Sequence, residues 1–180
     1  MNITTPRLLI REFHLNDLDT FLSYEKQKEM RQFEKGIVDR EAALEYLNRA
    51  VQDSCNTPRT YYKLAITVPP EDKVIGRISL ASQNPEIREW EIGWTVRVED
   101  WGKGYASEAA YQMLEFAFIQ LNAHRVVAFC HAKNTASINV MKKIGMKQEG
   151  HLRQTRWFNN SWADEFVYAI LETDFFQGER

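Results

Sequence analysis

The sequence lacks the features that would tie it to metals, disulfides, membranes or nucleic acids. Its two cysteines, Cys55 and Cys130, show neither metal-ligand spacing nor a disulfide framework, so we expect no metal and a reducing, cytoplasmic setting. The net charge of −2 provides no basic surface for a nucleic-acid partner. No apolar run approaches the roughly 20 residues of a membrane span. The first six residues lack the charged and apolar blocks of a signal peptide.

What remains is the composition of an ordinary globular protein. The chain has 180 residues, of which 44% are hydrophobic and 27% are charged. This length suits one compact domain with a sizeable core. No linker, repeat or low-complexity stretch interrupts the sequence. We therefore expect residues 1–180 to form a single domain.

Hydrophobic spacing predicts a mixture of strands and helices. We expect about seven strands, at residues 8–12, 61–68, 74–80, 89–98, 125–131, 148–158 and 162–171. We expect about four helices, at residues 18–24, 40–55, 105–121 and 135–144. Asn16 or Asp17, Asp39 and Asn134 precede three of these helices as candidate caps. The segments 28–37 and 82–85 are expected to be loops, and 159–161 to close a hairpin.

The order of these elements predicts an α/β fold with a mixed sheet. Residues 61–98 form an antiparallel meander, because short turns join their strands. A long helix then separates strand 89–98 from strand 125–131. A strand, a helix and a strand form a crossover unit, so these two strands are expected to be parallel neighbours. The predicted sheet is therefore mostly antiparallel, with a central parallel pair.

A glycine turn, Trp101-Gly102-Lys103-Gly104-Tyr105-Ala106, connects the strand and the helix of this crossover. Such a turn directs unpaired backbone N–H groups towards one point at the positive end of a helix dipole, which suits a phosphate. It is not a Walker A loop, because the sequence has no Gly, four residues and Gly-Lys-Ser/Thr. It matches a dinucleotide-binding fingerprint only weakly, because Ser107 stands where the third glycine would be and antiparallel strands precede the turn. Taken alone, such a Gly-x-Gly turn is more often a strand-to-helix connection that binds no ligand.

Two segments together resemble the signatures of the Gcn5-related N-acetyltransferase (GNAT) superfamily. The first is Glu91-Ile92-Gly93-Trp94, continued by Trp101-Gly102-Lys103-Gly104-Tyr105-Ala106-Ser107-Glu108-Ala109. The second is Asn134-Thr135-Ala136-Ser137, continued by Lys143-Ile144-Gly145-Met146. The opening Thr5-Pro6-Arg7-Leu8-Leu9-Ile10-Arg11 and the pair Ile75-Gly76 resemble the branch that acetylates ribosomal-protein N-termini, the RimJ/RimL-like branch.

The resemblance implies acetyl-CoA as co-substrate and a GNAT-type sheet whose central parallel strands splay apart. Pantetheine would pair with the exposed backbone of Trp94, Val96 and Val98. The pyrophosphate would lie on the turn residues Gly102, Lys103, Gly104, Tyr105 and Ala106, with Lys103 adding a mobile positive charge. Trp101 replaces the glutamine or arginine that is frequent in the family, which we regard as a minor departure. Asn134 and Ser137 would complete the cofactor site.

Two residues are candidates for proton transfer. Glu91 would accept the proton of the amine through water, and Ser137 would donate a proton to the leaving thiolate. Structural roles for these residues stay open. Glu91 would then form a structural pair with another side chain, Ser137 would be a solvent-exposed helical serine, and Asn134 would only cap its helix. Many relatives use a tyrosine as the acid where this chain has Met141.

The expected activity is direct transfer of an acetyl group to a primary amine, most simply a protein N-terminal α-amine. Alternative acceptors are an aminoglycoside, a polyamine or another small amine, and an alternative of another class is a non-catalytic acyl-CoA sensor. Relatives are monomers or homodimers. His124 and His131 are assigned no catalytic role, and Cys130 is expected to be a core residue. We expect Trp157, Phe158 and Trp162 to be core residues, and Glu29, Arg31 and Glu34 to lie in a solvated loop near the acceptor pocket.

Overall fold

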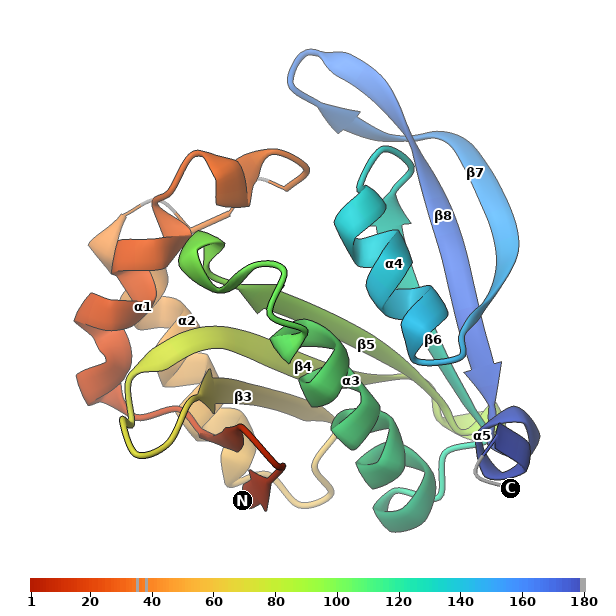
Figure 1. The fold of residues 1–180 in the computed structure, drawn as a ribbon, viewed down its shortest axis with the longest axis horizontal. Helices are drawn as coiled ribbons and strands as arrows, with labels where there is room; N and C mark the ends of the chain where they lie inside the picture. The colour runs from red at the N-terminus through yellow and green to blue at the C-terminus, as the bar shows by residue number, and fades with distance from the viewer. Residues whose placement is uncertain (35, 38, 179–180) are drawn as a thin grey trace.

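One mixed sheet runs through the protein, and the computed structural model describes residues 1–34, 36–37 and 39–178 of it (Figure 1). Within these residues the sheet has eight strands in the order β1-β2-β3-β4-β5-β6-β8-β7. The strands are β1 (Asn2–Thr4), β2 (Leu9–Glu12), β3 (Tyr61–Thr67), β4 (Val74–Asn84), β5 (Glu89–Val96), β6 (Arg125–His131), β7 (Lys147–Phe158) and β8 (Ser161–Leu171). Only β5 and β6 pair in parallel, as predicted.

Helices cover both faces of this sheet. They are α1 (Leu18–Glu25), α2 (Arg40–Ser54), α3 (Tyr105–Glu115), α4 (Thr135–Lys143) and α5 (Glu172–Gly178). In Figure 1, α3 and α4 lie in front of the sheet and α2 lies behind it. The α3 face forms the larger core, where Met113 and Leu114 pack with Ile78, Leu80 and Ile92. On the other face, α1 and α2 form a second core with Ala65 and Val74.

The mixed α/β fold is confirmed, and the structure corrects several details. The sheet has one more strand than expected, because the three-residue β1 is too short for a periodic pattern to indicate. The short helix α5 was also not predicted. Residues 82–85 are not a loop, since β4 continues through Asn84 and pairs with Glu89. Val98 does not belong to β5, because that strand ends at Val96 and Val98 begins a 3₁₀ turn.

The parallel pair is short, and this shapes the centre of the molecule. The pairing of β5 with β6 covers only three residue pairs and ends at Glu91 opposite Val127. Beyond that point β5 stays paired with β4 as far as Val96, while β6 continues beside β8. Figure 1 shows β5 and β6 diverging from the end near α5. The residues of β5 after Glu91 therefore have an open backbone edge on the β6 side.

Local side-chain chemistry explains where the helices start. The carboxylate of Asp39 accepts a hydrogen bond from the Ala42 N–H at 2.8 Å and caps α2, as predicted. Asp17 precedes α1 but does not cap it. Its carboxylate instead accepts hydrogen bonds from the Arg11 guanidinium and from the backbone N–H of His14. A buried ion pair thus competes successfully for the carboxylate that the sequence pattern assigned to the helix.

The final hairpin differs from its predicted environment. Asn159 and Asn160 both have positive φ and form the tight turn between β7 and β8, as predicted. However, Trp157 and Trp162 are 56% and 59% exposed, so the expectation that they lie in the core is wrong. Their rings contact each other edge to face at 5.1 Å near the tip of the hairpin, which projects beyond the other strands (Figure 1).

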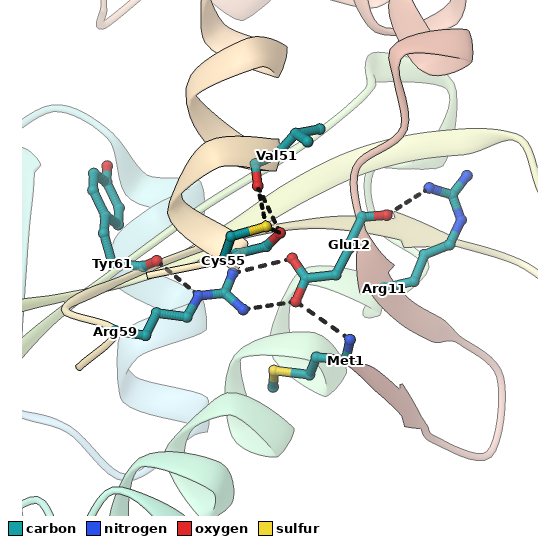
Figure 2. A network of polar contacts seen from close by, with 8 residues as sticks. Met1, Arg11, Glu12, Val51, Cys55, Arg59 and Tyr61 are labelled. Atoms are coloured by element: carbon teal, nitrogen blue, oxygen red, sulfur yellow. Dashed lines mark hydrogen bonds and ion pairs between the residues drawn. The ribbon is translucent and has the colours of Figure 1, made fainter. Parts of the chain in front are cut away.

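A polar network fixes the N-terminal hairpin β1–β2 (Figure 2). The Arg59 guanidinium donates two hydrogen bonds to the Glu12 carboxylate, at 2.7 and 3.0 Å. The Met1 ammonium lies 3.4 Å from the same carboxylate. The ends of the hairpin are therefore held at the sheet edge, and the turn between β1 and β2 is positioned with them.

The described residues include neither a membrane-spanning helix nor a metal-binding cluster. None of the described helices is long and apolar enough to cross a membrane. The described residues also contain no group of three or more His, Cys, Asp or Glu side chains arranged to hold a metal ion.

Candidate functional site

A cleft of about 680 Å³ opens where α3, α4 and the open edge of β5 meet. The residues of the glycine turn that line it are Trp101, Gly102, Gly104, Tyr105 and Ala106. The end of β5 contributes Trp94, Thr95 and Val96, and the start of α4 contributes Asn134 and Ser137. Most of the residues predicted for cofactor binding therefore share one cavity. Val98 and Lys103 are the two predicted cofactor residues that do not line it.

The turn has the backbone geometry of an anion site. Gly102 and Gly104 have φ of 76° and 81°, which side chains disfavour, and Gly104 is the N-cap residue of α3. The first intrahelical bond of α3 runs from the Glu108 N–H to the Gly104 carbonyl. The N–H groups of Tyr105, Ala106 and Ser107 precede it and have no helical partner, and all three residues line the cleft. Their N–H groups and the helix dipole favour a negative charge there.

Cations surround this turn, but the predicted one is engaged elsewhere. Lys103 forms an ion pair with Asp100, with 2.6 Å between its Nζ and the carboxylate, so part of its charge is compensated by that residue. Two other cations flank Gly104, because a Cβ added there would lie 3.4 Å from Arg7 Nη2 and 3.8 Å from Lys143 Nζ. Lys133 and Lys143 also line the cleft. The turn is therefore electropositive without Lys103.

The open edge of β5 offers backbone groups to the same cleft. The N–H of Arg97 donates to the Ile75 carbonyl on β4. In an antiparallel pair every second residue bonds to the same neighbour, so the backbone groups of Thr95 and Gly93 also point towards β4. The backbone groups of the residues between them point away from β4. Trp94 and Val96 are these alternate residues and face the gap left by β6. The indole N–H of Trp101 donates to the Val96 carbonyl at 2.6 Å. Trp101 thus ties the glycine turn to the end of the strand.

The start of α4 closes the opposite side of the cleft. Asn134 Oδ1 accepts a hydrogen bond from the Ser137 N–H at 3.0 Å, which confirms Asn134 as the helix cap. The half-buried Ser137 hydroxyl makes no hydrogen bond to any residue that the structure describes, and Ser137 lines the cleft. Met141 is fully buried in the core. The position that holds a tyrosine in many GNAT enzymes is here a packing position.

Glu91 lies on β5 next to the point where the strands separate. It is half-buried and does not itself line the cleft, although Glu34 does. Its carboxylate accepts a hydrogen bond from the Gln83 amide at 2.7 Å and has no ion pair with the described residues. Burial raises the pKa of Glu91, and the nearby carboxylates of Glu165 and Glu34 raise that pKa further. This carboxylate therefore holds a proton more readily than an exposed one.

Comparison with known proteins agrees with this geometry. The profile of the Acetyltransferase (GNAT) domain matches residues 7–147. The N-acetyltransferase YnaD of Bacillus subtilis strain 168 is 38% identical over 97% of this chain and 99% of its own length. The chain belongs to the GNAT acetyltransferase family. GNAT enzymes use acetyl-CoA as co-substrate, so the protein is an acetyl-CoA-dependent N-acetyltransferase.

Solved GNAT structures share the whole fold. The crystal structure of a GNAT-family acetyltransferase from Bacillus anthracis has a TM-score of 0.85 and 32% identity, covering 96% of this chain and 99% of that one. The ribosomal-protein-S5-alanine acetyltransferase from Vibrio fischeri has a TM-score of 0.84 and 19% identity, covering 97% and 98%. The second likeness is one of fold.

Two further groups at the end of β6, Cys130 and His131, do not line this GNAT cleft. Cys130 is buried in β6, and burial raises the pKa of its thiol to about 11, which disfavours a thiolate nucleophile. His131 is half-buried, and burial lowers its pKa, as do Arg156 and Lys133. The His131 ring contacts Phe33, with 5.1 Å between ring centres.

Sequence reasoning missed one buried ion pair in this GNAT cleft. Glu25 on α1 and Arg77 on β4 both line it, and 2.9 Å separates the Arg77 Nε from the Glu25 carboxylate. Burial alone would lower the pKa of Arg77, but Tyr46 and Glu25 raise it above its ordinary value. The partners are 52 residues apart, so no local pattern connects them. Glu29 and Glu34 also line the cleft, whereas Arg31 does not and Lys35 lies outside the described residues.

Proposed function

We propose that this enzyme acetylates the α-amine of a protein N-terminus by direct attack of the amine on the thioester of acetyl-CoA. One observation carries the acetyl-CoA part of the proposal: the glycine turn, the open edge of β5 and the Asn134–Ser137 cap line a single cleft. The Thr5–Arg11 segment adds the resemblance to the ribosomal-protein branch. The continuous sheet supports our further proposal that residues 1–180 act as one domain, and we expect that domain to work in the cytoplasm.

In this proposal each part of the cleft holds one part of the co-substrate. The N–H groups between Gly102 and Ala106 bind the pyrophosphate, and glycines allow its oxygens to approach closely. The backbone of Trp94 and Val96 pairs with pantetheine along the open strand edge. Asn134 contributes its amide N–H₂ group, because its side-chain oxygen already caps α4.

The chemical step needs one base, one acid and one polarising group. The neutral amine attacks the thioester carbon, forming the C–N bond, while a β5 backbone N–H stabilises the negative charge on the carbonyl oxygen. The C–S bond then breaks and the electron pair leaves with sulfur. Glu91 takes the proton of the amine through water, and the Ser137 hydroxyl donates a proton to the thiolate while it takes one back from solvent. The raised pKa of Glu91 makes its carboxylate a stronger proton acceptor than an exposed glutamate.

Two variants test these roles. Glu91→Gln is expected to lower kcat by about 10²-fold with little change in the KM of acetyl-CoA, because general base catalysis contributes roughly that much. Ser137→Ala is expected to slow thiol release, and Ser137→Thr should retain most of the rate because the hydroxyl is kept. Ser161→Ala at the start of the distal strand β8 is the matched control. Near-normal turnover of both Glu91→Gln and Ser137→Ala would remove the assigned roles.

A polyamine is a second candidate acceptor, favoured by two carboxylates that line the cleft. Glu29 and Glu34 line the cleft, and Glu34 and Glu165 act together on the pKa of Glu91. Carboxylates so placed attract a polycation. Thiol release should be compared for a peptide with a free N-terminal alanine, the same peptide with a blocked N-terminus, spermidine and an aminoglycoside. Turnover of the free peptide alone supports the proposal, whereas turnover confined to spermidine contradicts it.

A further inference from the structure

The N-terminal segment reaches the glycine turn through Arg7. The turn between β1 and β2 carries Thr5 and Arg7 to the first turn of α3, about 100 residues away in sequence. Arg7 Nη1 donates a hydrogen bond to the carbonyl of Lys103 at 2.9 Å. Lys103 lies between the two glycines of positive φ. Glycine leaves these positions conformationally free, so the carbonyl between them needs an external partner to stay fixed.

Arg7 also neutralises a carboxylate close to the proposed anion site. Arg7 Nε and Nη2 lie 2.7 and 2.6 Å from Glu108 Oε2, and the Arg7 backbone N–H donates to Oε1 at 3.0 Å. The Thr5 hydroxyl donates to the same oxygen at 2.6 Å. Burial opposes ionisation of Glu108, but the hydrogen bonds from Thr5 and Arg7 lower its pKa overall. Glu108 is therefore a carboxylate whose charge is compensated by Arg7.

The Arg7 side chain is itself held in place. Its guanidinium lies over the Tyr105 ring, 4.9 Å from the ring centre, and its Nη2 faces Gly104. Both neighbours belong to the glycine turn. The hairpin that carries Arg7 is anchored at its ends by the Met1–Glu12–Arg59 network (Figure 2). A planar guanidinium with several hydrogen bonds fixes the positions of its partners better than the flexible ammonium group of a lysine does.

We propose that Arg7 is a positioning residue for the pyrophosphate of acetyl-CoA, acting through the Lys103 carbonyl and through neutralisation of Glu108. The inference rests on the proposed function of the turn. Arg7 fixes the backbone N–H groups of the turn in their binding orientation, and it prevents the Glu108 carboxylate from repelling the phosphates. The reacting thioester lies at the other end of the cleft, so Arg7 contributes to binding and not to the chemical step.

The test compares acetyl-CoA with S-acetyl pantetheine, a thioester that has no pyrophosphate. Arg7→Ala should raise the KM of acetyl-CoA and the Kd of CoA by about tenfold, the effect expected for losing a charge-assisted hydrogen bond. Its kcat, and its kcat/KM for S-acetyl pantetheine, should stay close to those of the wild type. Arg7→Lys should give an intermediate KM. Arg40→Ala, which breaks the exposed Arg40–Asp19 pair, is the matched control.

A double variant separates the two parts of the effect. In Arg7→Ala/Glu108→Gln the repelling charge is gone, so this variant should bind CoA more tightly than Arg7→Ala alone. An equal loss of kcat/KM for both thioesters in Arg7→Ala and Arg7→Lys would identify a merely structural role and overturn the inference, as would unchanged CoA affinity. If Arg7→Ala does not fold, Arg7→Lys and Glu108→Gln are assayed in its place. The deciding quantity is then the ratio of kcat/KM for acetyl-CoA to kcat/KM for S-acetyl pantetheine. A wild-type protein that binds no CoA would instead overturn the proposed function.

Discussion

Replacing Gly104 with alanine separates the folding role of the glycine turn from its binding role. Gly104 has φ of 81°, and placing an alanine in this left-handed region costs roughly 1–2 kcal/mol. Part of that cost is offset by about 0.4–1 kcal/mol, because alanine restricts the unfolded chain. The new Cβ meets only the flexible ends of Arg7 and Lys143, at 3.4 and 3.8 Å. The net loss of stability is therefore about 1 kcal/mol, or roughly 2–4 °C in Tm for a chain of this length.

The effect on binding should be much larger than this. The Cβ of Gly104→Ala would stand between the cationic groups that flank the turn, where we place the pyrophosphate. Losing one charge-assisted hydrogen bond to phosphate costs about 1.5–3 kcal/mol, so CoA affinity should fall by at least about tenfold. Calorimetric titration with CoA measures the affinity, and thermal unfolding without ligand measures the stability.

The control is Gly150→Ala on β7. A Cβ there would make an ordinary contact with Val167 at 3.6 Å, and Gly150 has no positive φ, so Tm and affinity should stay close to those of the wild type. The reasoning would be refuted by a Gly104→Ala protein that loses the expected stability and still binds CoA like the wild type. The pyrophosphate would then lie elsewhere.

Three further predictions concern the rest of the site. The acetylation rate should fall as pH drops through the raised pKa of Glu91, and the pH-rate profile of Glu91→Gln should lack this fall. The variant should also have a higher Tm than the wild type at neutral pH, and this difference should disappear near the ordinary pKa of 4.5 or below. Asn134→Ala should cost about 1 kcal/mol of unfolding free energy in denaturant titration, because α4 loses its cap; unchanged stability would contradict this. Gly76→Ala should lower the free energy of unfolding by about 3 kcal/mol in the same assay, because its Cβ would lie 2.3 Å from the Thr95 carbonyl oxygen and force β5 to shift. Gly93→Ala should cost less, because the nearest atom to its Cβ is the Ser79 hydroxyl oxygen at 3.3 Å.

The sign of the Glu91 effect follows from where its proton binds more tightly. The folded state raises the pKa of Glu91, so between the ordinary and the raised value the folded protein holds more protons than the unfolded chain. Stability then falls as pH rises through this window, and the loss persists above it. Glutamine carries no charge to desolvate, so the variant avoids this loss. A variant less stable than the wild type at neutral pH would contradict the assignment.

Local patterns predicted the elements that build the cleft. The helical spacing after Tyr105 located α3, and Asn134 located the start of α4. The strand–helix–strand order predicted that β5 and β6 pair in parallel. These features depend on periodicity, capping and chain order, which can be recognised from residues close together in the sequence. The position of the glycine turn between β5 and α3 follows from them.

Contacts between distant segments could not be predicted in this way. The Arg7–Glu108 pair spans 101 residues, and the Arg77–Glu25 pair spans 52. Lys103 matches the motif, and its ion pair with Asp100 was not predicted. The exposure of Trp157 and Trp162 depends on how far the last hairpin projects, which their apolar character does not reveal. Such features are properties of the folded arrangement and not of any local stretch.

The central claim is that this cleft transfers acetyl groups to amines and does more than bind acyl-CoA. Its most direct test is the amount of CoA thiol released by the wild-type protein with acetyl-CoA and an amine acceptor, compared with the amount of acetylated acceptor found by mass spectrometry. The account predicts that thiol release requires the acceptor and equals the acetylated product. Tight binding of acetyl-CoA without acceptor-dependent thiol release, across peptides and polyamines alike, would contradict it.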